Sequence, residues 1–334
     1  APHTAPLAIH DLAAGVGGDT IALAAALSDG EVTAVDEDPA RLELLRHNLK
    51  VHALAATLVT GDALTHRVGP CAGVHADPGR RSGGRRVRRL SAHLPSVPAL
   101  LEAHAGAAVV AVALSPGVDP LDPELPAGVE VTFVQVAGRL LEATVWAGRQ
   151  ARAAVTRTGA VLLDTDGAEV ARLPAAAHPG APTAGPVSEE LPVGEIGAWL
   201  VEVAPAAVRA RRHDELGSSI GARRIARSRA LLTTDSPPPS SPWYHAREVL
   251  AVLPARPKAV RRWLDTALAH DHLDGGVEVV LHGIEADVDE LLRSFGRPRT
   301  GPHGLRIELV RLDRGSVAVV TAAAGPPAGG RLAP

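Results

Sequence analysis

The sequence predicts an α/β fold for the first half of the chain, a doubly wound sheet that ends in a hairpin, and a smaller α+β domain after it. Three observations predict this architecture. Short apolar runs alternate with segments of helical periodicity, acidic residues recur where the runs end, and the order of elements changes in the second half. Alternating strands and helices form a mostly parallel sheet, whose strands all end at one edge.

The predicted elements of the first half follow from apolar runs and from leucines at helical spacing. Strands are predicted at 7–9, 31–35, 57–60, 73–76 and 107–114, and 129–135 and 139–146 form an antiparallel hairpin. Helices are predicted at 20–27, from Pro39 to about His52, and at about 87–105. Asp38 suits the N-cap of the second helix and Pro39 its first turn. Together, residues 1–150 form the first predicted domain.

In the second half of the chain, the sequence patterns predict four further segments. Residues 151–174 resemble a small β meander, and 175–192, rich in Ala, Pro and Gly, form a linker. Residues 193–322 form the α+β domain, and 323–334 a disordered tail. Within the domain, the patterns predict strand 249–253, helix 258–269, strand 277–282, helix 287–295, and strands 305–312 and 316–321.

Composition limits the classes of function. The 334 residues are 46% hydrophobic and only 2% aromatic, and the net charge of −3 gives no global signature of nucleic-acid binding. A single cysteine, Cys71, excludes an internal disulfide framework and suits a reducing cytosol. Neither a signal peptide nor a membrane-spanning apolar run is visible, so we expect a cytoplasmic protein without a membrane partner. The oligomeric state is not indicated.

A glycine-rich turn joins the first strand to the first helix. It runs from Asp11 through Gly15 and Gly17, and brings a nucleotide-like ligand to a helix N-terminus. A dinucleotide fingerprint needs a third glycine where Thr20 stands, so the fit to NAD is poor. Asp11 can accept a hydrogen bond from an ammonium group but would repel a pyrophosphate. The turn therefore favours S-adenosyl-L-methionine, whose amino-acid moiety carries an ammonium.

Acids follow the next three strands at the same edge of the predicted sheet. Asp36 lies 19 residues after Gly17, where a carboxylate can bind both ribose hydroxyls, and Asp62 can accept from the adenine amine. Asp77 ends the fourth strand. Each acid alone can be a helix N-cap. Together with Asp11, the set favours a ligand site, because ligands on such sheets bind at the carboxyl ends of the strands.

These motifs also resemble a known family. The series D-L-x-x-G-x-G-G-D, A-V-D-x-D-P with H-N downstream, and G-D-A-L resembles the class I S-adenosylmethionine-dependent methyltransferases, which have a Rossmann-like sheet. The resemblance covers about 7–150. It is greatest to a bacterial branch with a THUMP-like C-terminal domain, and the first motifs are similar to trimethylguanosine synthase. It implies methyl transfer and a cofactor pocket that involves the residues Asp11, Ala13, Gly15, Gly17, Asp36, Glu37, Asp62 and Ala63.

The fourth strand end departs from the better-understood enzymes of this fold. Amine-directed nucleic-acid methyltransferases carry [D/N/S]-P-P-[aromatic] there, and this chain has Asp77-Pro78-Gly79-Arg80-Arg81. The departure weakens the prediction of a base amine as acceptor. We predict catalytic roles for Asp77, Pro78, Arg80 and Arg81: Asp77 orients or deprotonates the nucleophile, and a guanidinium stacks on a base or binds phosphate.

Six arginines lie within the ten residues 80–89, directly after Asp77. They form either a basic loop that grips an RNA backbone or a solvated loop in an arginine-rich chain. A second arginine cluster, over 209–229, leaves the same two interpretations open, and the aromatic residues typical of single-strand binding are absent there.

Three functions are compatible with these patterns. The favoured one is a methyltransferase that acts on RNA, either tRNA or rRNA. The alternatives are a methyltransferase for a small molecule or a protein, and a non-catalytic RNA-binding protein that retains the fold. No metal is predicted, because the cluster His270-Asp271-His272 has no further ligand pattern around it.

Overall fold

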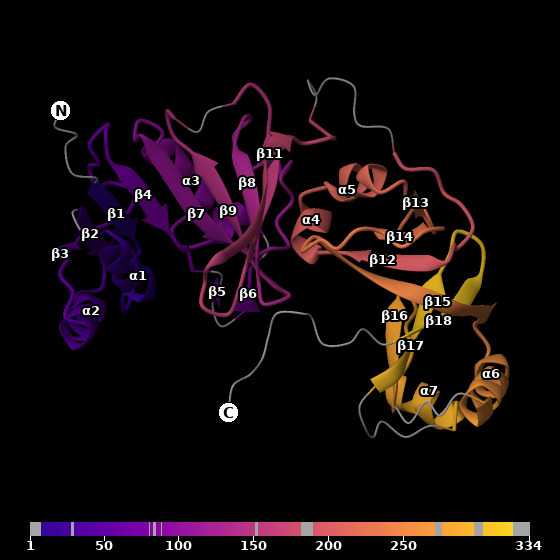
Figure 1. The fold of residues 1–334 in the computed structure, drawn as a ribbon. Helices are drawn as coiled ribbons and strands as arrows, with labels where there is room; N and C mark the ends of the chain where they lie inside the picture. Colours follow the sequence, from indigo (N-terminus) through magenta and orange to yellow (C-terminus); the bar gives the residue numbers. More distant parts are fainter. Residues whose placement is uncertain are drawn as a thin grey trace. The chain divides into compact units, whose positions relative to one another are not determined.

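The computed structural model describes residues 8–27, 30–79, 81–82, 85–87, 89–150, 153–181, 190–270, 276–296 and 303–322. The chain divides into two compact units (Figure 1). The first unit is Ala1–Val187 with Pro205–Arg211, and the second is Ser188–Ala204 with Arg212–Pro334. The predicted tail, 323–334, lies outside the described residues.

A nine-stranded mixed sheet forms the first unit, in the order β11-β10-β8-β9-β7-β4-β1-β2-β3. Its strands are β1 (Ala8–Leu12), β2 (Glu31–Asp36), β3 (Thr57–Thr60), β4 (Gly73–Ala76), β7 (Val109–Leu114), β8 (Glu130–Val136), β9 (Arg139–Ala147), β10 (Arg157–Leu163) and β11 (Glu169–Ala177). A separate two-stranded hairpin consists of β5 (Arg81–Ser82) and β6 (Arg85–Arg86).

The helices of this unit are α1 (Gly18–Ala26), α2 (Pro39–Val51), the 3-10 turn η1 (Leu90–Ala92), α3 (Val97–Ala103) and α4 (Pro205–Arg209). Helix α2 forms as the sequence predicts. The side chain of Asp38 caps it by accepting from the backbone N–H of Ala40 at 2.9 Å. Its leucine stripe is buried against the sheet, and consists of Leu42, Leu45 and Leu49.

Five adjacent strands of the sheet, in the order β7-β4-β1-β2-β3, pair in parallel and end at one edge. Strand β1 pairs in parallel with β2 and β4, β2 pairs with β3, and β4 pairs with β7. The strand order therefore reverses between β1 and β4, where a crevice forms in an open α/β sheet. Strand β9 is antiparallel to β7 and β8, as the predicted hairpin requires. The α/β class with a large mixed sheet is confirmed.

The helix predicted at 87–105 is shorter in the structure. Among the described residues of this range, only η1 and α3 are helical, because the backbone of Leu94 pairs with Gly79 through hydrogen bonds of 2.8 and 3.1 Å. Pro95 disfavours a helical conformation at the preceding residue. Pro98 lies in the first turn of α3, where a proline is tolerated.

Strands β10 and β11 pair in antiparallel order within the region where the β meander is predicted, 151–174, but they are also part of the large sheet. Strand β10 pairs in parallel with β8 and antiparallel with β11, so both extend the first sheet. Five of the seven residues of β10 are buried, and such a strand needs neighbours on both faces. The predicted linker, 175–192, consequently begins inside β11, and its residues 182–189 lie outside the described part of the chain.

The second unit contains a seven-stranded sheet in the order β13-β14-β12-β15-β18-β17-β16. Its elements are β12 (Trp199–Val203), α5 (His213–Ser219), β13 (Arg223–Arg224), β14 (Leu231–Thr234), β15 (Tyr244–Pro254), α6 (Pro257–His270), β16 (Gly276–His282), α7 (Val288–Ser294), β17 (His303–Arg311) and β18 (Ser316–Ala322). From β15 onward the predicted order is confirmed. The core joins helices α6 and α7 to the sheet, through Val260, Leu264, Leu292 and Phe295. Within the described ranges, no helix has the length and hydropathy needed to cross a membrane.

Candidate functional site

A cavity of about 540 Å³ lies where β1, β2, β3 and β4 end. Its volume suits a small organic ligand. Five residues that the sequence assigns to the cofactor line it, which are Ala13, Asp36, Glu37, Asp62 and Ala63. Thus residues that are far apart in the chain meet at one edge of the sheet, as the acidic strand ends predict.

Asp36 connects the cavity to the glycine turn. Its side chain is almost fully buried, and its Oδ2 accepts from the backbone N–H of Gly15 at 2.8 Å, while Oδ1 accepts from the N–H of Asp38 at 2.9 Å. An ionised carboxylate has about four lone-pair directions, so it can still accept from a ligand hydroxyl. Asp36 therefore both stabilises the glycine turn, through its hydrogen bond with Gly15, and lines the cavity.

The segment after β3 is held from two sides. The Oδ1 of Asp62 accepts from the backbone N–H of Leu64 at 2.8 Å, which closes a tight turn, and the residue is exposed at the cavity. Behind it, the carbonyl of Ala63 is 2.7 Å from Nε2 of the buried His104. These two contacts fix the backbone that directly follows Asp62.

The glycines of the turn act through the backbone. Gly15 and Gly17 have φ values of 58° and 94°, the left-handed region that glycine adopts most readily. A Cβ at Gly17 would overlap the side chain of Leu45 on α2. Neither glycine lines the cavity, but both shape the turn that places Ala13 there.

Asp11 is not among the residues that line this cavity, and its contact with an ammonium group stays a prediction. The residue is 1% exposed, and one carboxylate oxygen accepts from the hydroxyl of Thr20. The other oxygen is 3.0 Å from Nδ1 of His75. Through these two contacts Asp11 holds the start of α1 and the ring of His75. Local spacing could not show this, since His75 is 64 residues away.

The predicted catalytic segment follows β4. Asp77 is exposed and Pro78 is buried, and Gly79 lines the cavity. Arg81 lies in β5, opposite Arg86 in β6. Arg80 and the side chain of Arg81 are outside the described part of the structure.

One part of the cavity wall was not predicted from the sequence. It consists of Ser91, His93, Leu94, Pro95 and Ser96. Both the backbone N–H and the hydroxyl of Ser91 donate to Glu124, at 2.9 and 2.7 Å. No motif marks this wall, because its position depends on the pairing of Leu94 with Gly79.

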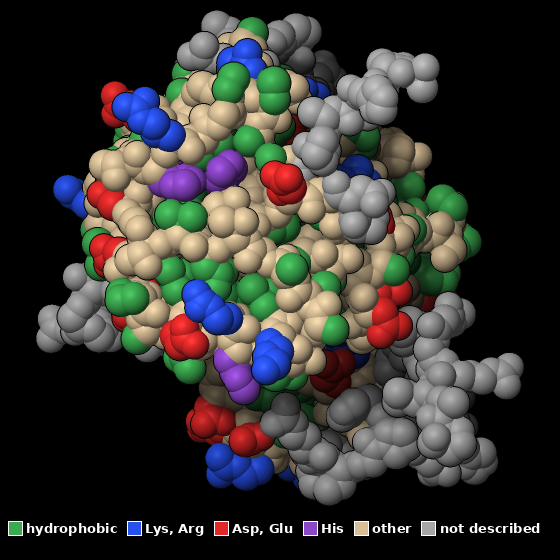
Figure 2. Space-filling model, turned by 90° about the vertical axis from the view of Figure 1, so that its left-hand side faces the viewer, with side chains coloured by type: hydrophobic (Ala, Val, Ile, Leu, Met, Phe, Trp, Pro, Cys, Tyr) green, Lys and Arg blue, Asp and Glu red, His purple; other side chains and the backbone are tan. Residues whose placement is uncertain are grey.

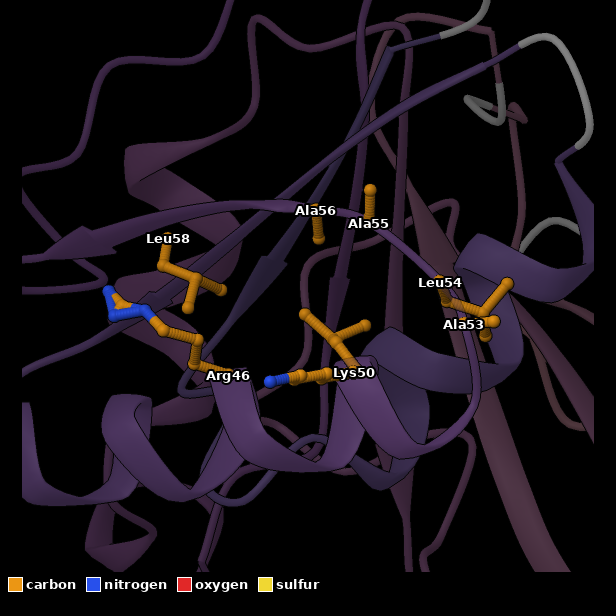
Figure 3. Close-up of a pocket in the computed structure, with 8 residues that line it drawn as sticks. Arg46, Lys50, Ala53, Leu54, Ala55, Ala56 and Leu58 are labelled. Carbon is orange, nitrogen blue, oxygen red and sulfur yellow. The ribbon is translucent and has the colours of Figure 1, made fainter.

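A second, more open depression lies between the end of α2 and the start of β3 (Figure 3). In the view of Figure 3 the side chain of Arg46 extends from the helix toward Leu58, and that of Lys50 lies along the helix. No carboxylate lines it, and Arg46 already contacts Glu43 at 3.1 Å. It contains none of the residues predicted for the cofactor, so we do not assign it to the reaction. Among the residues whose placement is described, no group of three or more side chains could hold a metal ion.

Comparison with known proteins identifies the family. No family model matches the chain. Uncharacterized S-adenosylmethionine-dependent methyltransferases from two strains of Mycobacterium tuberculosis are each 30% identical to it over 317 residues, which cover 94% of this chain and 80% of theirs. A candidate methyltransferase from Porphyromonas gingivalis W83 has a similar crystal structure, with a TM-score of 0.75 at 16% identity, over 96% of this chain and 78% of that one. The chain is a member of the S-adenosylmethionine-dependent methyltransferase family.

Proposed function

We propose that the cavity at the ends of β1 to β4 binds S-adenosyl-L-methionine and that the enzyme transfers the methyl group to RNA, either tRNA or rRNA. One observation supports this most strongly: the cavity lined by Asp36 and Asp62 is also lined by Gly79, which directly follows Asp77-Pro78 and precedes an arginine-bearing hairpin. Asp36 would accept from the ribose hydroxyls, and Asp62 from the adenine amine. When bound, the cofactor supplies a methyl group already activated by the sulfonium.

The protein then needs mainly to align the acceptor with that methyl group. Asp77 is exposed at the end of β4, where its carboxylate can orient an N–H or O–H group of the acceptor. Pro78 is buried and Gly79 is fixed to Leu94, so the backbone that carries Asp77 is held on its C-terminal side. The arrangement suits a positioning role for Asp77.

The hairpin β5–β6 supports RNA as the acceptor. Arg81, Arg85 and Arg86 lie in its two short strands, within ten residues of Asp77. Clustered arginines bind a phosphate backbone. By contrast, basic and acidic side chains are interspersed on the face drawn in Figure 2, and neither sign forms a continuous patch there.

The second unit would contribute RNA binding. Its order of elements from β15 to β18 is the one predicted for the α+β domain, and the resemblance to the bacterial branch implies that this domain is THUMP-like. We also infer a cytoplasmic location, where RNA substrates occur and where the exposed thiol of Cys71 stays reduced.

The test uses S-adenosylmethionine carrying a tritiated methyl group and total bacterial RNA. We expect label in the RNA that ribonuclease releases and protease does not, and loss of labelling in Asp77→Asn. The triple variant Arg81→Gln, Arg85→Gln, Arg86→Gln should bind RNA at least tenfold more weakly, with a shallower dependence on salt. The control, Arg46→Gln with Lys50→Gln, removes two charges from α2 and should change neither. Label that enters only protein or small molecules would contradict RNA as the acceptor.

A further inference from the structure

We propose that His75 accepts the proton that the acceptor loses during methyl transfer, and that buried Asp11 holds the ring for this task. The inference rests on the proposed position of the reaction beside Asp77. It assigns a role to the only histidine among the residues of β4, which the predicted motifs left unused.

The contact with Asp11 fixes the tautomer of the ring. His75 lies opposite Asp11 in the register of β4 and β1, and its Nδ1 is 3.0 Å from a carboxylate oxygen. An ionised carboxylate only accepts, so Nδ1 carries the proton and the lone pair of the neutral ring is on Nε2. Nε2 has no hydrogen-bond partner among the described residues, and the His75 side chain remains 20% exposed. The ring is therefore oriented and still accessible.

His75 also lies on the side of the sheet edge that carries Asp77. Side chains two residues apart in an extended segment point to the same face. Asp19, in the first turn of α1, is close enough to both residues for their charges to affect its ionisation. Burial raises the pKa of Asp19, and Asp11 and Asp77 raise it further, while His75 opposes them. The Nε2 atom thus belongs to the same neighbourhood as Asp77.

The surroundings make the neutral ring a better base. Burial disfavours the charged ring, but the hydrogen bond to Asp11 and the charges of Asp11, Asp19 and Glu142 outweigh it, so the pKa of His75 is raised. In the step itself, the acceptor forms a bond to the methyl carbon and the carbon–sulfur bond breaks, with its electron pair left on sulfur. The acceptor's proton passes to Nε2. One positive charge is lost at sulfur and one appears on the imidazole, beside the Asp11 carboxylate.

The first test is His75→Asn, whose amide can still donate to Asp11 near the former position of Nδ1 but cannot act as a base. The control is His47→Asn, an exposed histidine of α2. Single-turnover transfer of tritiated methyl is measured from pH 6 to 9, with RNA or with whichever cell fraction the wild type labels. We expect the rate of His75→Asn to fall about 100-fold and lose its rise with pH, with unchanged affinity for S-adenosylmethionine. A rate within about threefold of wild type would overturn the proposal.

The second test needs no acceptor. Nitrogen-15 NMR of labelled histidines, with the His75 signals assigned by their loss in His75→Asn, reports the tautomer and the pKa directly. We expect a neutral Nδ1–H tautomer, a pKa above the ordinary value of about 6.5, and a lower pKa in Asp11→Asn. An Nε2–H tautomer or a pKa below that value would overturn the proposal. Failure of the wild type to label RNA would count against RNA as the acceptor and would leave the role of His75 untouched.

Discussion

Gly17 is the residue on which the glycine turn depends most. Its φ of 94° is unfavourable for any residue with a Cβ, and the Cβ would overlap Leu45, whose side chain is fully buried. The neighbouring Gly18 differs on both counts. It begins α1, and a Cβ there would meet nothing within 4 Å.

These two positions give a matched pair of substitutions. We expect Gly17→Ala to lower the free energy of unfolding by about 1–3 kcal/mol, through strain and overpacking. Gly18→Ala should leave it unchanged or raise it slightly, since alanine is the better helix former. Urea denaturation of both variants measures the difference. Equal stability of the two would contradict the role of Gly17.

Some residues of the site could be predicted from the sequence and others could not. Asp36 and Asp62 could be placed at the cavity, because strand ends and acidic positions are visible in local patterns. The contact between Asp11 and His75 could not be predicted, because His75 comes from a neighbouring strand far along the chain. Register between distant strands is set by tertiary pairing, which no short motif encodes.

The turn after β3 is packed against a cluster of histidines. Nδ1 of His10, in β1, is 3.0 Å from Nε2 of His66, and His104 lies close to both. Burial lowers the pKa of His10, and the neighbouring His66 and His104 lower it further. Burial and His104 lower the pKa of His66 in the same way. Protonation of these rings therefore opposes folding.

The sign of the pH effect follows from linkage. Because both pKa values are lower in the folded protein, the unfolded chain binds more protons below about pH 6.5, so stability rises with pH up to that value. We expect wild type to gain more stability between pH 5 and pH 7.5 than His66→Gln, in which the paired rings are gone. Urea midpoints at the two pH values, with His47→Gln as control, measure this. An equal gain in His66→Gln and wild type would exclude the effect.

Elements differ in how well the sequence predicts them. Strands β2, β3 and β4 and helix α2 agree with prediction, since apolar runs and leucine spacing are local signals. The region 87–105 does not, because the pairing of Leu94 with Gly79 overrides its helical periodicity. The short elements β12, α5, β13 and β14 were missed. Strand β12 pairs with β14 and β15, which come much later in the chain, and β13 has only two residues.

The boundary between the two compact units is not a single point in the sequence. After β12, the segment Pro205–Arg211 belongs to the first unit again. There the N–H of Ala206 donates to Gln135 at 3.1 Å, and Arg209 donates to the carbonyl of Val118 at 2.7 Å. The guanidinium of Arg209 also lies 5.4 Å from the ring centroid of Phe133. Helix α4 thus completes the first unit.

This arrangement predicts the cost of cutting the chain at the expected linker. A protein that ends at Val187 should have a lower Tm than the first unit in the full chain, because Phe133 and Gln135 lose the cover of α4. Arg209→Ala in the full chain should lower the stability of the first unit by about 1–3 kcal/mol. Calorimetry of the three proteins tests both statements. A truncated protein as stable as the intact first unit would show that α4 is dispensable.

Binding of the cofactor at this cavity is tested by isothermal titration of S-adenosylmethionine into the wild type and Asp36→Ala. The control is Asp38→Ala, which changes the N-cap of helix α2. We predict micromolar binding to wild type, a loss of about 1–3 kcal/mol of binding free energy in Asp36→Ala, and a smaller change in Asp38→Ala. Equal affinity of Asp36→Ala and wild type, with both proteins folded, would contradict the placement of the cofactor in this cavity.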